Sequence, residues 1–259
     1  MKKNAKIVSL SFTLIGLSLS YNAYAEENRI TGPVHPAARC SKAFAGEECE
    51  NRRIKDYNTG CITYDELNSL RNYAAYPICV ENDLLAWCPC GCFDSSTRIF
   101  GVNLNNKEAK YYNILEIVGN TSNYNVVTLN LGSTLSNLKT KSSAIKKVTA
   151  GPEEMPLITF NTANGQKLSV TQEHAILLSD GRMVAAKDVK NSDHLVQADG
   201  KPVAISSIES KKVKDDVINI QTEGKTSIEH TLFAEGLIVG DLMWQNNLKS
   251  LLNDIAIRK

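Results

Sequence analysis

One stretch divides the chain into two parts of different character: Cys88-Pro89-Cys90-Gly91-Cys92-Phe93-Asp94-Ser95-Ser96-Thr97-Arg98-Ile99. Six cysteines precede Cys92, and none of the 167 residues that follow it is a cysteine. We therefore expect a small cysteine-rich module before the stretch and a domain of another kind after it.

Cys92 has a chemical option that most cysteines lack, because it stands at this boundary and follows a glycine. Its thiol can attack the carbonyl of Gly91 and convert the Gly91-Cys92 peptide bond into a thioester. Glycine suits the position, since it has no side chain to obstruct the sulfur and tolerates unusual backbone geometry. These residues alone also allow a second interpretation, in which Cys92 is one more disulfide partner.

The first residues have the pattern of a secretory signal peptide. Three lysines among the first six residues precede an apolar run over residues 7–19, and Ala23-Tyr24-Ala25 supplies a small-x-small cleavage site. We expect residues 1–25 to direct export by a Sec-type route, which makes the mature chain secreted, periplasmic or exposed at the cell surface. The apolar run is too short for a membrane-spanning helix, so no transmembrane segment is expected after signal removal.

The charge balance gives no electrostatic reason to expect nucleic acid as a partner. The chain has 29 basic and 28 acidic residues, and removal of three lysines with the signal leaves a net charge of −2. A zinc site built on Cys88, Cys90 and Cys92 with His35 is disfavoured, because zinc-binding cysteine pairs are usually spaced more widely and exported thiols are oxidised. No metal and no cofactor is predicted.

Export also changes how the seven cysteines are interpreted, because thiols outside the cytoplasm tend to pair. An odd number leaves one over, and we predict that this one is Cys92. Six cysteines can pair in fifteen ways, and the sequence does not choose among them. The disulfide candidates are Cys40, Cys49, Cys61, Cys79, Cys88 and Cys90.

Residues 26–91 are predicted to form a small, disulfide-rich and partly helical module. Its clearest element is a helix from Thr63 to about Tyr76, with Thr63 and Glu66 placed as a capping box. Such a short segment cannot bury a large core, so disulfides are expected to supply stability.

Residues 92–245 have the pattern of an all-β domain, followed by a C-terminal tail over residues 246–259. Hairpin signals stand at Asn164-Gly165, Asp180-Gly181 and Asp199-Gly200. The loop Ser133–Lys147 is the segment that looks least ordered. The predicted strands are Tyr124–Leu131, Leu157–Phe160, Lys167–Thr171, Ala175–Leu178, Val203–Ile208, Val217–Thr222 and Thr231–Val239.

Cleavage through a thioester needs more than a thiol, and Thr171-Gln172-Glu173-His174 offers the other parts. The carbonyl of Gly91 must be polarised as the oxyanion forms, and the departing nitrogen of Cys92 must receive a proton. A threonine and a histidine three residues apart, across a turn after a strand, can point at one place.

At this point the sequence shows a resemblance. Gly91-Cys92-Phe93 with Thr97-x-Ile99 resembles the opening motif of the Hint domain, the self-processing module of inteins and hedgehog proteins, and residues 170–177 resemble its Thr-x-x-His block. Residues 180–195 are similar to the family's continuation, although Ser192 stands where glycine is usual. Residues 217–220 and 230–239 resemble its last two strands.

The resemblance implies an all-β, horseshoe-like fold and an N–S acyl shift at Gly91-Cys92. It makes Cys92 the nucleophile, His174 the residue that protonates or strains the scissile amide, and Thr171 a stabiliser of that arrangement. His230 matches a histidine near the end of the domain that can serve later steps, or it has a structural role at the start of a strand.

The end of the resemblance departs from a splicing intein, which finishes in His-Asn before Cys, Ser or Thr. Here Gly240-Asp241-Leu242 stands at that place. The pattern therefore favours amino-terminal cleavage over splicing, with release or transfer of the 66-residue fragment 26–91. The acyl acceptor stays open between water, a small thiol, a lipid hydroxyl and a protein amine.

The reaction would be a single-turnover cysteine autoprocessing, and it competes with another hypothesis. A catalytically inactive Hint-like β domain could serve as a scaffold that carries an exported binding module. The presence of Cys92, Thr171 and His174 together favours the active interpretation.

Overall fold

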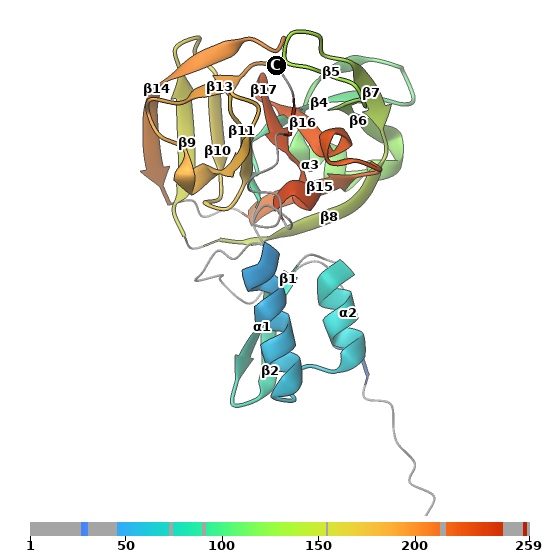
Figure 1. Cartoon of the computed structure of the whole chain (residues 1–259). Helices are drawn as coiled ribbons and strands as arrows, with labels where there is room; N and C mark the ends of the chain where they lie inside the picture. Colours follow the sequence, from blue (N-terminus) through green and yellow to red (C-terminus); the bar gives the residue numbers. More distant parts are fainter. Residues whose placement is uncertain are drawn as a thin grey trace, which may run out of the picture.

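The computed structural model describes residues 27–30, 46–72, 75–89, 92–153, 155–212, 216–245 and 256–257. The predicted signal peptide, Cys40, Cys90, Gly91 and most of the predicted tail lie outside the described residues. Figure 1 shows a small module of helices and a hairpin beneath a larger β domain.

The described part of the small module contains two helices followed by a β-hairpin. Helix α1, Gly46–Asn58, was missed by the sequence analysis, and it is followed by α2, Tyr64–Asn72. Strands β1, Ala75–Val80, and β2, Asp83–Pro89, pair antiparallel.

The capping box of α2 is confirmed, but the helix is shorter than predicted. The backbone nitrogen of Glu66 donates to Thr63 Oγ1 at 3.2 Å, and the backbone nitrogen of Thr63 donates to Glu66 Oε2 at 2.9 Å. The predicted helical run to Tyr76 is wrong at its end, because the chain enters β1 at Ala75, where β2 supplies an antiparallel partner.

A disulfide and a few large side chains hold the module together. Cys61, in the loop between the helices, is bonded to Cys79 of β1. The buried cluster around this bond contains Ile30, Cys61, Ile62, Leu67, Leu70, Ala75 and Trp87. A disulfide-stabilised, partly helical module is therefore confirmed.

The β domain contains one seven-stranded sheet, with the strand order β13-β14-β9-β10-β3-β15-β8. Neighbouring strands in this order pair antiparallel. Its strands are β3, Phe93–Asp94; β8, Ile145–Pro152; β9, Leu157–Thr162; β10, Lys167–Val170; β13, His194–Val196; β14, Pro202–Lys211; and β15, Asp216–Thr222.

A second sheet has the order β12-β11-β17-β16-β4-β6-β7, with β5 paired to β4. Its strands are β4, Arg98–Asn103; β5, Ala109–Asn113; β6, Tyr124–Leu129; β7, Thr140–Ser143; β11, Ala175–Leu177; β12, Met183–Ala185; β16, Thr231–Ala234; and β17, Leu237–Gly240. Helix α3, Ile114–Gly119, and three short 3-10 helices, Thr121–Asn123, Ala186–Asp188 and Ser227–His230, lie between strands.

The predicted hairpins are confirmed, and their glycines have the positive φ that such turns need. Gly165, Gly181 and Gly200 have φ of 82°, 93° and 85° and connect β9 to β10, β11 to β12 and β13 to β14. The run predicted as one strand over 231–239 is instead the hairpin β16–β17, because Glu235 and Gly236 also adopt positive φ.

The segment 133–147 is more regular than the sequence indicated. It contains β7 and the start of β8, two strands that end their respective sheets. An edge strand exposes unpaired backbone groups, and charged residues such as lysine are common there because they oppose pairing with other chains. The serine and lysine residues of these strands therefore hid the strand pattern in the sequence. Strand β8 also lies beside β2, so this edge faces the small module (Figure 1).

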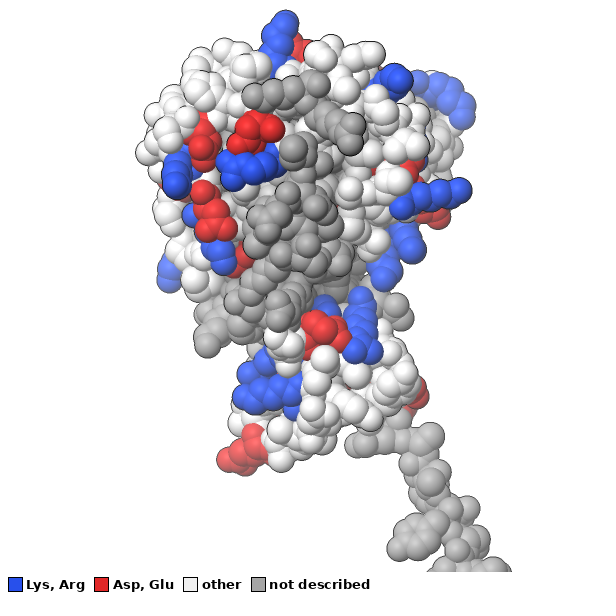
Figure 2. Space-filling model, viewed as in Figure 1, with Lys and Arg blue, Asp and Glu red and all other residues white. Residues whose placement is uncertain are grey.

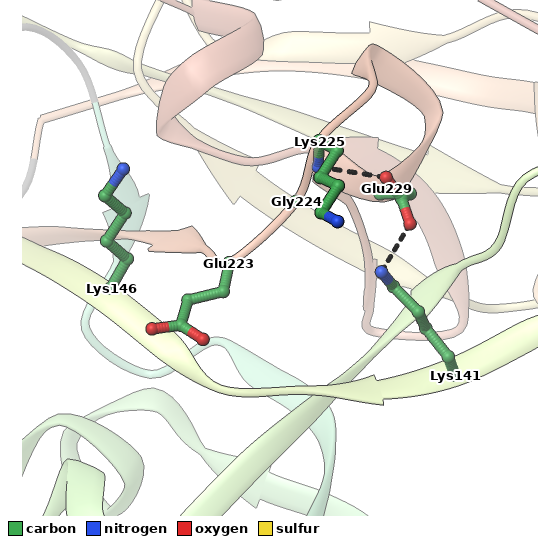
Figure 3. Close-up of a pocket in the computed structure, with 6 residues that line it drawn as sticks. All are labelled: Lys141, Lys146, Glu223, Gly224, Lys225 and Glu229. Atoms are coloured by element: carbon green, nitrogen blue, oxygen red, sulfur yellow. Dashed lines mark hydrogen bonds and ion pairs between the residues drawn. The ribbon is translucent and has the colours of Figure 1, made fainter.

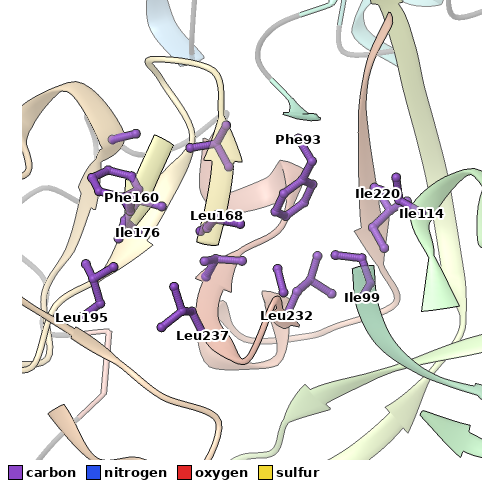
Figure 4. Packing of buried hydrophobic residues seen from close by; sticks show 14 of the residues in the cluster. Phe93, Ile99, Ile114, Phe160, Leu168, Ile176, Leu195, Ile220, Leu232 and Leu237 are labelled. Carbon is purple, nitrogen blue, oxygen red and sulfur yellow. The ribbon is translucent and has the colours of Figure 1, made fainter. Parts of the chain in front are cut away.

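The main core lies between the two sheets and includes the start of β3. Phe93, on the strand that begins the domain, is fully buried beside residues of both sheets (Figure 4). The labelled members of this core are Phe93, Ile99, Ile114, Phe160, Leu168, Ile176, Leu195, Ile220, Leu232 and Leu237. Burial of each such side chain contributes roughly 1.5–3 kcal/mol, so the residue that follows Cys92 is firmly anchored.

Candidate active site around Cys92

Cys92 connects the small module to the β domain. It lies between β2 and β3, its side chain is fully buried, and it is the free cysteine among the described residues. Cys49, Cys61, Cys79 and Cys88 are all disulfide-bonded. The sulfur packs with Leu157 and Val217, two apolar side chains.

Thr171, which directly follows β10, makes two hydrogen bonds to the backbone of Cys92. Its hydroxyl oxygen accepts a hydrogen bond from the Cys92 backbone nitrogen at 2.7 Å, and its own backbone nitrogen donates to the Cys92 carbonyl at 2.8 Å. The nitrogen bound by Thr171 Oγ1 belongs to the Gly91-Cys92 peptide bond. The structure therefore brings together the first two residues that the sequence singled out.

His174 follows in a turn that keeps it close to this pair. Its backbone nitrogen donates to the carbonyl of Thr171 at 3.1 Å, and its ring lies against Phe93 with the centroids 4.0 Å apart. The side chain is fully buried, and neither ring nitrogen has a hydrogen-bond partner among the described residues. Burial lowers the pKa of His174 to about 3, so the imidazole is neutral at physiological pH.

The surroundings of the Cys92 thiol favour its protonated form. Burial raises its pKa well above the ordinary value, and the negative charges of Glu153 and Asp216 raise the pKa further. The hydroxyl of Thr149, 3.9 Å from the sulfur, acts in the opposite direction. A buried thiol of this kind needs local stabilisation before it can act as a thiolate nucleophile.

His230 belongs to a different cluster. Its Nδ1 lies 2.8 Å from Asp241 Oδ2 and 3.3 Å from Thr222 Oγ1, and none of its hydrogen bonds within the described part of the chain reaches Cys92, Thr171 or His174. The structure thus does not join the fourth predicted site residue to the other three.

Gly240 and Asp241 occupy the place where the sequence departs from a splicing pattern. A Cβ atom at position 240 would lie 2.6 Å from Trp244 Cβ and 2.7 Å from Ala175 Cβ, so the packing leaves no room for a side chain. The buried Asp241 accepts hydrogen bonds at Oδ2 from Thr222 and His230 and at Oδ1 from the Met243 nitrogen. Neighbouring side chains therefore fill the space around Gly240, and hydrogen bonds hold the Asp241 carboxylate in place.

Two polar residues that the sequence did not reveal, Thr149 and Asn219, lie on the other side of Cys92. Thr149 of β8 contacts the sulfur, and Asn219 of β15 pairs with Thr149 in the register. Asn219 is fully buried and donates to Gln245 Oε1 at 2.7 Å. The sequence could have pointed to Asn219, because it is an amide residue within an otherwise apolar strand. Thr149 gave no such indication, because it follows the segment 133–147, which was predicted to be a loop.

A surface hollow lies near His230 rather than near Cys92. Lys141, Lys146, Glu223, Gly224, Lys225 and Glu229 line it, and Glu229 is bound by Lys141 and by the backbone of Lys225 (Figure 3). On the face seen in Figure 2, acidic and basic side chains lie next to one another over the left of the β domain.

The described residues hold neither a metal-binding cluster nor a helix that could span a membrane. No group of three or more histidine, cysteine, aspartate or glutamate side chains there has a metal-binding arrangement. Likewise, none of the described helices is both long and apolar enough to cross a membrane.

Comparison with known proteins gives matches by structure alone. No family model and no curated protein sequence matches the chain. The structure of an intein from a hyperthermophile superposes with a TM-score of 0.50 at 17% identity, covering 58% of this chain and 99% of the intein. A DnaB intein from Synechocystis (TM-score 0.46, 18% identity) and an intein-like domain from Clostridium thermocellum (0.45, 14%) each match over 58% of this chain and 98% of their own.

The first of these superpositions spans almost the whole intein and agrees with the two antiparallel sheets described above. The β domain of this chain has the Hint fold, the fold of the inteins.

Proposed function

We propose that the chain cleaves itself at Gly91-Cys92 through an N–S acyl shift. The Cys92 thiol loses its proton and attacks the carbonyl carbon of Gly91; a C–S bond forms, the C–N bond breaks, and the Cys92 nitrogen takes up a proton. The observation that carries the proposal is a free, buried thiol whose own backbone nitrogen is held by the Thr171 hydroxyl at 2.7 Å.

Thr171 and His174 have distinct roles in this proposal. Thr171 fixes the scissile peptide by accepting from its N–H group, which orients the nitrogen that becomes the leaving group. His174 is neutral, so one ring nitrogen carries a proton to donate while the other accepts. A buried imidazole without a partner costs free energy, and interaction with the scissile amide during cleavage would offset that cost.

The proposed outcome is release or transfer of the amino-terminal module rather than splicing. Splicing would need a carboxy-terminal cyclising residue and a free neighbourhood around it, whereas position 240 has no space for a side chain and Asp241 is held by several hydrogen bonds. Water, a small thiol, a lipid hydroxyl or a protein amine would take the acyl group.

Export of the chain is part of the same proposal. The signal-like residues 1–25 would direct it across a membrane, and the Cys61–Cys79 disulfide suits an oxidising compartment. The released product would then be a secreted or surface module.

Intact mass spectrometry tests the proposed reaction. Purified wild-type chain and the Cys92→Ala variant are incubated with and without dithiothreitol or hydroxylamine, which attack thioesters. The wild type is expected to break after Gly91, faster with either nucleophile, while Cys92→Ala stays whole. A wild-type chain that stays whole under every condition would establish the inactive scaffold instead, and a break in both proteins would exclude Cys92 as the nucleophile.

A further inference from the structure

Four polar residues form a row across neighbouring strands of the seven-stranded sheet. Phe93 of β3 pairs with Val170 of β10 and with Ile218 of β15. One step along these antiparallel strands, Cys92 therefore stands between Thr171 and Asn219. Because Asn219 pairs with Thr149 of β8, the row continues to Thr149.

Within this row Thr149 touches the reacting atom itself. Its hydroxyl oxygen lies 3.9 Å from the Cys92 sulfur, which is within reach of a hydrogen bond to sulfur, and both side chains are fully buried. No other hydrogen bond of the Thr149 hydroxyl occurs within the described residues. The hydroxyl proton is therefore available to the sulfur.

The need for such a donor follows from the rest of the environment. Leu157 and Val217 cover the sulfur with apolar surface, and Glu153 and Asp216 oppose a negative charge on it. His174, three residues after Thr171 in the chain, is neutral, and its ring makes no hydrogen bond to the sulfur. Among the described residues, the Thr149 hydroxyl is the group with a hydrogen-bond contact to this sulfur, and it can stabilise a thiolate there.

We infer that Thr149 is a catalytic residue of the proposed cleavage, whose hydroxyl donates to the Cys92 sulfur and stabilises the thiolate as it attacks Gly91. The inference rests on the proposed function, and it adds a residue that the Thr-x-x-His motif does not contain. It also gives β8, an edge strand beside the small module, a direct part in the chemistry.

Three variants of the full chain separate this role from a structural one. Thr149→Val keeps the shape and removes the hydroxyl, and Thr149→Ser keeps the hydroxyl and removes a methyl group. Thr128→Val is the matched control. Thr128 is equally buried, but it lies in the second sheet, where its hydroxyl forms a hydrogen bond with Ser143 of the neighbouring strand. Thermal unfolding of each variant shows whether the fold is kept, and Thr149→Ala replaces the valine variant where that one does not fold.

The rate of cleavage in dithiothreitol is the first readout. Hydrogen bonds to charged groups are among the stronger ones, so Thr149→Val is expected to cleave at least about tenfold more slowly than wild type. Thr149→Ser and Thr128→Val are expected to stay within about threefold. Equal rates for wild type and Thr149→Val, or an equal loss in Thr149→Ser, would overturn the inference and leave the proposed function intact.

The infrared S–H stretching band of Cys92 is the second readout, and it does not depend on cleavage. It is recorded in a His174→Phe background, in which the chain is expected to stay whole. Loss of the contact in Thr149→Val should move the band toward that of a thiol without a hydrogen bond, and Thr149→Ser should restore it. An unmoved band overturns the inference. A moved band in a chain whose wild type never cleaves would instead mean that the proposed function has failed.

Discussion

Among the described histidines, His174 is the most deeply buried. It is fully buried, lies against Phe93, and has two ring nitrogens without a partner among the described residues. Its pKa is lowered from 6.5 to about 3 by burial alone. A folded protein that keeps this histidine neutral must become less stable as the pH falls, since the unfolded chain binds a proton that the folded chain refuses.

The free energy of unfolding should therefore depend on pH through His174. The stability that depends on neutral His174 is complete above about pH 6.5 and is lost as the pH falls toward 3, at about 1.4 kcal/mol per pH unit. Between pH 7 and pH 5 the wild type should lose about 2 kcal/mol more than His174→Phe. Urea unfolding at the two pH values measures the difference.

The exposed His194 provides the control for this measurement. His194→Gln should follow the pH dependence of the wild type, because this variant leaves the buried His174 in place. If His174→Phe and wild type lose stability in parallel, then His174 is not kept neutral by the fold.

A short helical turn after β17 connects the hydrogen-bonded cluster around His230 to the row of residues around Cys92. The turn over residues 242–245 begins at Asp241, whose Oδ1 accepts from the Met243 nitrogen, and it carries Gln245 to Asn219 in the row of Cys92. Asp241 also ties Thr222 of β15 to His230 through Oδ2. The carboxylate thus connects β15, the start of β16 and the turn.

Replacement of this carboxylate by an amide should therefore destabilise the domain. In Asp241→Asn the amino group must face either the three donors now at Oδ2 or the Met243 nitrogen now at Oδ1, so at least one buried hydrogen bond is lost. The expected loss is about 1–3 kcal/mol in the free energy of unfolding, measured by urea denaturation. Asp199→Asn, in an exposed hairpin turn, should leave the stability unchanged. An Asp241→Asn variant as stable as wild type would show that the cluster does not stabilise the fold.

The sequence predicted elements where local chemistry decides them. Asn164-Gly165 and Asp199-Gly200 indicate turns because glycine supplies the positive φ. The capping box of Thr63 and Glu66 indicates the start of α2. The sequence did not predict contacts that depend on the order of the strands within a sheet. Thr149 lies 57 residues from Cys92 in the chain, and the two meet only because β8, β15 and β3 are neighbours in one sheet.

Among the described residues, the amino-terminal module and the β domain have separate hydrophobic cores. The described cluster around Cys61 includes no residue of the β domain, and the two large clusters of the β domain include no described residue of the module. Such a division suits a chain that is cut between the two parts, since each part would keep its own core after cleavage.

Because the module's core is small, its stability should depend on the Cys61–Cys79 disulfide in a way that the β domain's does not. The bond closes a loop with a sequence separation of 18, which contributes about 3 kcal/mol in a chain-entropy account. We expect Cys61→Ala/Cys79→Ala, made in a Cys92→Ala chain that stays uncut, to speed amide hydrogen exchange in residues 46–89 and to leave residues 92–245 unchanged. The Cys92→Ala chain alone is the matched control, because it removes a buried cysteine that is not in a disulfide. Faster exchange in both parts together would mean that the module and the β domain unfold as one unit, so that cleavage at Gly91 would have to break a shared fold rather than separate two stable ones.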